Sequence, residues 1–125
     1  MKGYTTTVTY TSKEISKKES IRLKDLTDAI SLDAATEGGE TLQIKPVLWA
    51  VVAVHNESSR EKDYNKYVIE DADGIKYVTG SESFWSSFED IVEEMNGVDE
   101  EWALSIYKRP SKNYAGKGFL TCSVI

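Results

Sequence analysis

The sequence predicts one mainly β domain that contains a single long helix. Two stretches, 102–107 and 120–124, alternate apolar and polar residues with the period of two that half-buried strands require. A run rich in Val and Ile at 42–55 and a hairpin at 64–79 supply the other strands. Residues 81–97 carry apolar side chains at the spacing of an amphipathic helix.

Length and composition fit a globular chain with one core. The 125 residues, 40% hydrophobic and 29% charged, are enough to bury a core without a metal or a disulfide. The single Cys122 excludes an internal disulfide, and a polar, Thr-rich stretch follows Met1 where a secretory signal would be apolar. We therefore expect a protein of a reducing cytoplasm, with no membrane association.

Residues 1–40 are expected to form a partly flexible N-terminal extension ahead of the main domain, 41–125. Residues 4–10 fit a marginal strand, and residues 20–32 fit a short helix or an irregular covering segment equally well. Gly38-Gly39 then interrupts the chain. The sequence leaves open whether this extension caps the domain, binds a ligand or joins subunits.

The long strand at 42–55 contains Pro46, which cannot donate a hydrogen bond to a ladder. We expect a bulge or an unpaired edge position there, at which the strand bends. Trp49 lies off the main apolar parity of this strand, so core packing and stacking on a ligand are both open for it.

The next hairpin is expected to turn through Asp73-Gly74 as a tight type I′ turn. In that register Ile69 faces Val78 on the buried side. Lys66 and Tyr77 then lie on the other side, which gives the hairpin an aromatic and basic outer face.

The helix at 81–97 has signals at both ends, a serine cap before it and Asn96-Gly97 after it. We expect Trp85 and Trp102 to pack in the core under this helix. Its acidic side chains fall opposite the apolar ones, as on a solvated face.

Charge is unevenly distributed along the chain, whose net charge is −6. Residues 81–101 contain eight acidic side chains and no basic one, and the rest of the chain has fifteen basic and thirteen acidic residues. No acidic residue follows Glu101. One surface can therefore attract phosphate even though the whole chain is acidic.

A basic ten-residue loop, 109–118, joins the last two strands. Pro110, Gly116 and Gly118 prevent either strand from running through it. Loops are commonly polar, so a solvated turn is the simplest interpretation of the loop by itself. Its place in the fold decides whether it has a function.

From residue 42 onward the predicted order is strand, strand, strand, helix, strand, strand. This is the order of the OB-fold, a five-stranded Greek-key barrel, here with one helix between strands 3 and 4. That fold binds oligonucleotides on its second and third strands and between its first and last inter-strand loops. Those loops correspond to 56–63 and 109–118.

The run KYVIEDADGIKYVTGSES, a helix and then LSIYKRPSKNYAGKGFLTCSVI resemble the single-stranded-DNA-binding proteins of phages and mobile elements, including the small ones of protein-primed phages. The resemblance covers about two thirds of the chain, 42–125. It implies sequence-nonspecific binding of displaced strands during replication or recombination in a bacterial host cell. Replication or recombination proteins are the further partners it implies, and self-association is left open. Because the chain ends in Ser-Val-Ile without an acidic tail, we do not expect it to recruit partners as cellular homologues do.

Binding single strands requires cations for the phosphates and aromatic faces for the bases. The predicted site combines the two loops with the outer face of the hairpin: Trp49, Arg60, Lys62, Tyr64, Lys66, Tyr77, Tyr107, Arg109, Lys112, Tyr114, Lys117 and Phe119. A preference for DNA over RNA does not follow from these residues.

An enzyme is not expected, and neither is a metal or cofactor. A Cys-His pair would need His55 beside Cys122, whose thiol lies on a core parity where thiols are inert. The Asp-Ala-Asp-Gly turn lacks the further ligands of a calcium loop. The alternative function is a protein-binding module, a host-factor or anti-defence protein that presents its acidic helix to a basic partner.

Overall fold

The computed structural model describes residues 3–58, 60–98, 101–110 and 118–125 and confirms a mainly β chain. In order, its elements are β1 (Tyr4–Thr11), α1 (Lys17–Lys24), β2 (Ile30–Ser31), α2 (Leu32–Ala35), the 3-10 helix η1 (Glu37–Gly39), β3 (Leu42–Ile44), β4 (Pro46–Asn56), β5 (Asp63–Asp71), β6 (Lys76–Thr79), α3 (Glu82–Met95), β7 (Leu104–Pro110) and β8 (Gly118–Val124).

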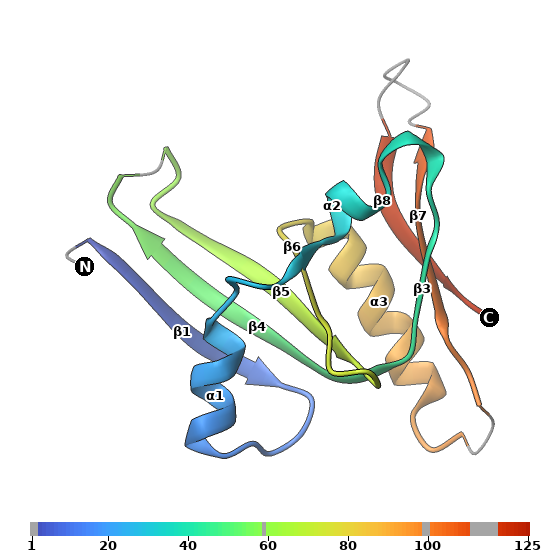
Figure 1. The fold of residues 1–125 in the computed structure, drawn as a ribbon, viewed down its shortest axis with the longest axis horizontal. Helices are drawn as coiled ribbons and strands as arrows, with labels where there is room; N and C mark the ends of the chain where they lie inside the picture. The colour runs from blue at the N-terminus through green and yellow to red at the C-terminus, as the bar shows by residue number, and fades with distance from the viewer. Residues whose placement is uncertain (1–2, 59, 99–100, 111–117) are drawn as a thin grey trace.

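The strands form two sheets, one of five strands in the order β1-β4-β5-β6-β2 and one of three in the order β3-β7-β8 (Figure 1). Neighbouring strands are antiparallel except β2 and β6, which run parallel. Within the described residues neither sheet closes on itself. The closed barrel expected from the strand order is therefore not observed.

The long strand predicted at 42–55 turns from one sheet into the other. Its first part, β3, pairs with β7, whereas β4 lies between β1 and β5. The change occurs at Lys45-Pro46, and the register between β4 and β5 shifts between Pro46 and Leu48. The bend falls where a residue without a backbone N–H interrupts the ladder, as predicted.

The N-terminal segment supplies both edge strands of the five-stranded sheet. β1 pairs with β4 along its length, and β2 pairs with β6. α1 starts at Lys17, where the Ser16 hydroxyl accepts a hydrogen bond from Glu19 N at 3.2 Å. Leu23 of α1 is buried with four apolar residues of β4 and with Val68 of β5, so α1 covers one face of the sheet.

The β5–β6 hairpin differs from the predicted register by one residue. Asp71 Oδ1 accepts hydrogen bonds from the N–H groups of Asp73 and Ile75, both at 3.0 Å, and Asp71 N donates to Ile75 O. The turn therefore contains three residues between Asp71 and Ile75, with Gly74 at φ 81°.

This one-residue difference moves side chains to the opposite face of the sheet. Ile69 pairs with Tyr77, and Val68 with Val78. Tyr77 is 5% exposed and lies in the core with Ile69, whereas Val78 packs on the α1 side. The prediction that Tyr77 lies on an outer face is wrong.

α3 begins and ends as predicted and packs between the two sheets (Figure 1). Ser81 Oγ accepts a hydrogen bond from Phe84 N at 3.2 Å, and Gly97 follows the last turn at φ 82°. Phe84 and Phe88 are fully buried among residues of both sheets, and Trp85 stacks on Tyr67 with ring centroids 4.9 Å apart. The acidic side chains of α3 are exposed.

Candidate functional site

The outer face of the β7–β8 hairpin brings together the predicted site residues that lie beside the basic loop. Arg109 pairs with Phe119, and Tyr107 with Thr121, so these four side chains share one face of the hairpin. Arg109 is exposed, Phe119 is 45% exposed, and Tyr107 and Thr121 are partly exposed. β7 and β8 contain no acidic residue.

The inner face of the same hairpin holds this surface in place. Leu104, Ile106, Leu120 and Cys122 are buried in the core beneath α3, as their alternation predicts. Burial raises the pKa of the Cys122 thiol to about 11, so the thiol is neutral and unreactive near pH 7. The outer residues therefore project from a rigid support.

Thr121 was not among the predicted site residues, although its parity with Phe119 places it on the same face. Alternation from Phe119 is the sequence signal that identifies it. Lys112, Tyr114 and Lys117 lie outside the described residues, in the segment that joins the two strands.

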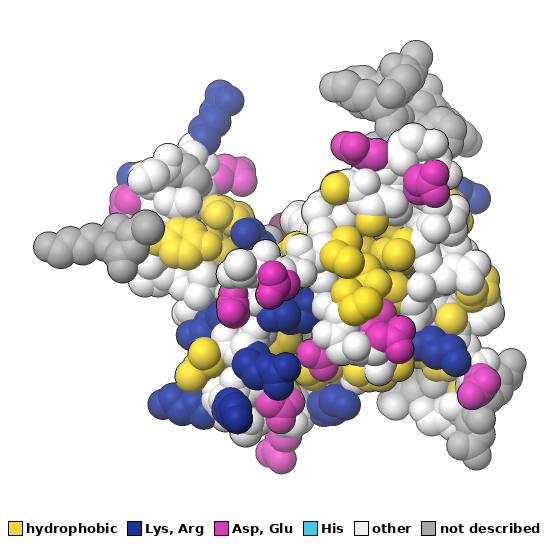
Figure 2. Space-filling model, viewed as in Figure 1, with side chains coloured by type: hydrophobic (Ala, Val, Ile, Leu, Met, Phe, Trp, Pro, Cys, Tyr) yellow, Lys and Arg dark blue, Asp and Glu magenta, His cyan; other side chains and the backbone are white. Residues whose placement is uncertain are grey.

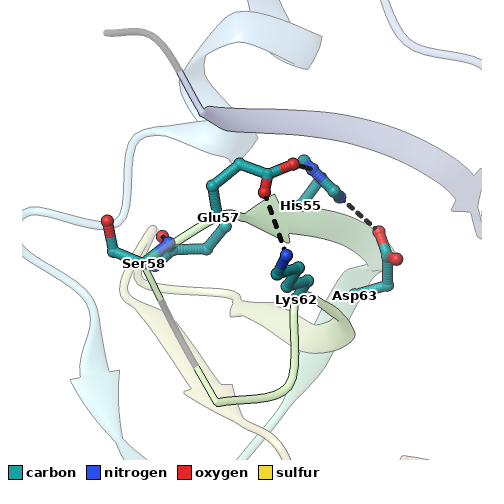
Figure 3. A network of polar contacts seen from close by, with 6 residues as sticks. His55, Glu57, Ser58, Lys62 and Asp63 are labelled. Atoms are coloured by element: carbon teal, nitrogen blue, oxygen red, sulfur yellow. Dashed lines mark hydrogen bonds and ion pairs between the residues drawn. The ribbon is translucent and has the colours of Figure 1, made fainter.

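The connection between β4 and β5 contains Arg60 and Lys62, but it is not a basic surface. His55 lies between two carboxylates, with Nδ1 at 2.7 Å from Asp63 Oδ1 and Nε2 at 2.6 Å from Glu57 Oε1 (Figure 3). Lys62 Nζ lies 3.3 Å from Glu57 Oε2. The Glu57 carboxylate therefore partly neutralises the charge of Lys62, which weakens the attraction of Lys62 for a phosphate.

Hydrogen bonds from the imidazole set the protonation behaviour of this cluster. The hydrogen bond to Asp63, followed by that to Glu57, raises the pKa of His55. The hydrogen bond from His55, followed by that from Lys62, lowers the pKa of Glu57. The cluster therefore favours the charged form of the His55 imidazole and the ionised form of Glu57.

A hollow of about 670 Å³ lies beside this cluster on the α3 side of the five-stranded sheet. Its walls come from β1, β4 and β5 and from the start of α3, and its charged residues are His55, Glu61, Asp63 and Glu82. This polar and mostly acidic lining does not fit a phosphate backbone.

Three predicted site residues, Tyr64, Lys66 and Tyr77, are divided between the two faces of the five-stranded sheet. Tyr64 pairs with Val54 and Lys66 with Val52, and both valines belong to the core that α1 covers. Tyr77 lies on the opposite face and is buried, so it cannot stack on a base there without unfolding. These three residues do not form one surface, which corrects the prediction.

Trp49 lies in contact with the core beneath α3. Its ring meets Phe88 edge to face, with centroids 5.4 Å apart, and its side chain remains partly exposed. The structure thus shows core packing for one side of the Trp49 ring and leaves its other side partly exposed.

Basic side chains also gather around α1, at the lower left of Figure 2, with acidic side chains among them. α1 contributes Lys17, Lys18, Arg22 and Lys24. Lys76 of β6 is tied to this helix, because its Nζ donates to Arg22 O at 2.7 Å and to Asp25 O at 2.5 Å. This surface mixes basic and acidic side chains, whereas β7 and β8 contain no acidic residue.

The β4–β5 end of one sheet and the loop-side ends of β7 and β8 in the other lie at opposite sides of the molecule (Figure 1). Tyr107, Arg109 and Phe119 belong to the β7–β8 hairpin, whereas Arg60, Lys62 and Tyr64 belong to the β4–β5 end of the other sheet. The outer face of the β7–β8 hairpin is the part of the predicted site that the structure brings together.

No group of three or more His, Cys, Asp or Glu side chains in the described ranges is arranged to hold a metal ion. No helix in this part of the chain has the length and apolar character needed to cross a membrane. Comparison with protein-family models, curated proteins and solved structures finds no match to this chain.

Proposed function

We propose that the protein binds single-stranded DNA without sequence preference through the outer face of its β7–β8 hairpin. The observation that carries this proposal is the cross-strand pair of Arg109 and Phe119, exposed on a hairpin without acidic residues. Tyr107 and Thr121 extend the same face. An exposed ring next to a guanidinium offers base stacking and a phosphate contact within one short surface.

The strand pairings support an open relative of the OB-fold. Pairing runs from β6 through β5 to β4, and from β3 through β7 to β8, with β3 and β4 joined at the bend. Among the described strands the remaining ladder needed to close a barrel, between β6 and β8, is absent, and α3 packs there. In this arrangement the β7–β8 hairpin occupies the place of the last two barrel strands, whose loop contributes to oligonucleotide binding.

The resemblance to phage and mobile-element proteins suggests the setting. A protein that binds displaced strands during replication or recombination does not need to recognise particular bases. Stacking on Phe119 and a phosphate contact from Arg109 are both independent of base identity. The basic residues of the adjoining loop, Lys112 and Lys117, add charge to the same hairpin. The sequence from β7 through β8 thus contains four basic residues, Lys108, Arg109, Lys112 and Lys117, and no acidic one.

Fluorescence anisotropy of a labelled oligothymidylate tests the proposal. Replacing Phe119 by Thr removes the ring and keeps a good strand former, so affinity should fall by roughly 1–3 kcal/mol. Phe119→Trp keeps a stacking surface and should retain the affinity. No binding by the wild-type chain at low salt would contradict the proposed function.

Salt dependence separates a specific phosphate contact from general attraction. Arg109→Gln should reduce the slope of log affinity against log salt by about 0.7, the value for one phosphate of a single strand. Lys18→Gln on α1 removes the same charge from a different surface and should change the slope less. Equal changes of the salt slope for the two substitutions would contradict a phosphate contact that belongs to the β7–β8 hairpin.

A further inference from the structure

A groove of about 530 Å³ lies at the C-terminal half of α3. It is bounded by the end of β1, the start of β4, the last turns of α3 and the segment before β7, and its lining includes Tyr10, Trp49, Glu89, Val92, Glu93 and Trp102. In Figure 1 the C-terminal end of α3 and the loop-side ends of β7 and β8 point to opposite ends of the molecule.

Three aromatic side chains line this groove and are supported in different ways. Trp49 is held edge to face against Phe88, and Trp102 packs against the same core. Tyr10, on an edge strand, is 48% exposed. The Ser12 hydroxyl accepts a hydrogen bond from Trp49 N at 3.1 Å, which ties the end of β1 to β4 beside the groove. The surfaces of Trp49 and Trp102 are therefore fixed before any ligand binds.

The charged side chains that line the groove are acidic. Glu89 and Glu93, one helical turn apart, are exposed along one wall, and neither forms an ion pair with a described cationic side chain. The last turn of α3 contains no basic residue, so nothing within the helix offsets the negative end of its dipole. No lysine, arginine or histidine lines the groove in the described part of the chain.

We propose that this groove binds an arginine side chain from a basic segment of a partner protein. A guanidinium stacks on Trp and Tyr faces and pairs with carboxylates, so each component of the lining contributes. Val92 and Met95 suit the methylene stem of the same side chain. DNA is repelled by this lining, which makes the groove a separate site from the β7–β8 surface.

The tryptophan indole N–H resonances report directly on binding. Adding a peptide with two arginines flanked by glycines should shift the signals of Trp49 and Trp102. Trp85, buried and stacked on Tyr67, should stay unchanged and serves as the internal reference. The same peptide with glutamine in place of arginine should produce no shift. Absence of shifts with the arginine peptide, or equal shifts with both peptides, would overturn the proposal.

Paired substitutions on α3 test whether the groove or the whole acidic helix attracts the peptide. Glu89→Gln with Glu93→Gln removes two charges from the groove and should weaken binding roughly 10-fold, since each pair contributes a modest, screened attraction. Asp90→Asn with Glu94→Gln removes the same charge from residues that do not line the groove, and should weaken binding less than about 2-fold. Equal losses would show general attraction and overturn the proposal.

Tyr10→Thr tests the aromatic contribution at a position where the fold is not at risk, because Tyr10 is half exposed on an edge strand. Loss of one exposed cation–π contact should weaken arginine binding roughly 2- to 5-fold. Tyr10→Phe should retain the affinity. An unchanged affinity for Tyr10→Thr would contradict a contribution from this ring.

Discussion

At the scale of single residues, His55 makes the β4–β5 connection sensitive to pH. Because hydrogen bonds to Asp63 and Glu57 raise its pKa above 6.5, the folded state favours the protonated ring. This contribution to stability is fully present below about pH 6.5 and is lost as the pH rises through the higher pKa of the folded state. NMR titration of the His55 ring protons should give a pKa above 6.5.

Removing each carboxylate in turn should separate their effects on His55. Asp63→Asn should lower the pKa of His55 more than Glu57→Gln does, because the hydrogen bond to Asp63 is the larger cause of the shift. Asp73→Asn, in the β5–β6 turn, is a matched control and should leave the His55 titration unchanged. A His55 pKa that is insensitive to both Asp63→Asn and Glu57→Gln would contradict the cluster of Figure 3.

At the scale of an element, Asp71 determines the register of the β5–β6 hairpin. Its Oδ1 accepts two backbone hydrogen bonds, the Tyr77 hydroxyl lies 3.4 Å from Oδ2, and the side chain is buried. Asp71→Ala leaves these donors unpaired and should lower the free energy of unfolding by about 1–3 kcal/mol in urea denaturation.

The amide variant separates turn geometry from charge. Asp71→Asn keeps one oxygen acceptor for the N–H groups of Asp73 and Ile75, so it should be less destabilising than Asp71→Ala. If both variants unfold at the same urea concentration, the turn hydrogen bonds do not determine hairpin stability.

Elements that depend on local sequence were predicted correctly, whereas the register of the β5–β6 hairpin was not. Alternation identified β7 and β8, Pro46 marked the bend, and a serine cap and Gly97 marked the limits of α3, because each depends on local backbone chemistry. The register of the β5–β6 hairpin depends on a competition between two turns, both compatible with Asp73-Gly74. The Asp71 carboxylate selects the longer turn, and the resulting one-residue change moved Tyr77 from the predicted site into the core.

At the scale of the whole molecule, long-range pairing was the part that the sequence patterns did not determine. The strand order from residue 42 is as predicted, but whether β6 and β8 meet depends on what packs between them. α3, with Phe84 and Phe88 fully buried, packs there, and β2 pairs with the edge of β6. The pairing of β1 with β4 was likewise not evident from its threonine-rich sequence. Both outcomes keep the β4–β5 end and the β7–β8 hairpin in different sheets and leave the hairpin as the candidate interface.

The architecture predicts that residues 41–125 need residues 1–40 in order to fold. β1 covers one edge of β4, and Leu23 of α1, 3% exposed, covers Leu48, Val52 and Val68. A chain limited to residues 41–125 would expose these apolar side chains and an unpaired β4 edge, so it should fail to show cooperative thermal unfolding and should aggregate. In the full chain, Leu23→Ala should lower the free energy of unfolding by about 2–5 kcal/mol, whereas Ile21→Ala, at a side chain 58% exposed, should have a much smaller effect. Cooperative unfolding of the 41–125 chain at the temperature of the full protein would show instead that the N-terminal segment is dispensable and that 41–125 is an independent domain.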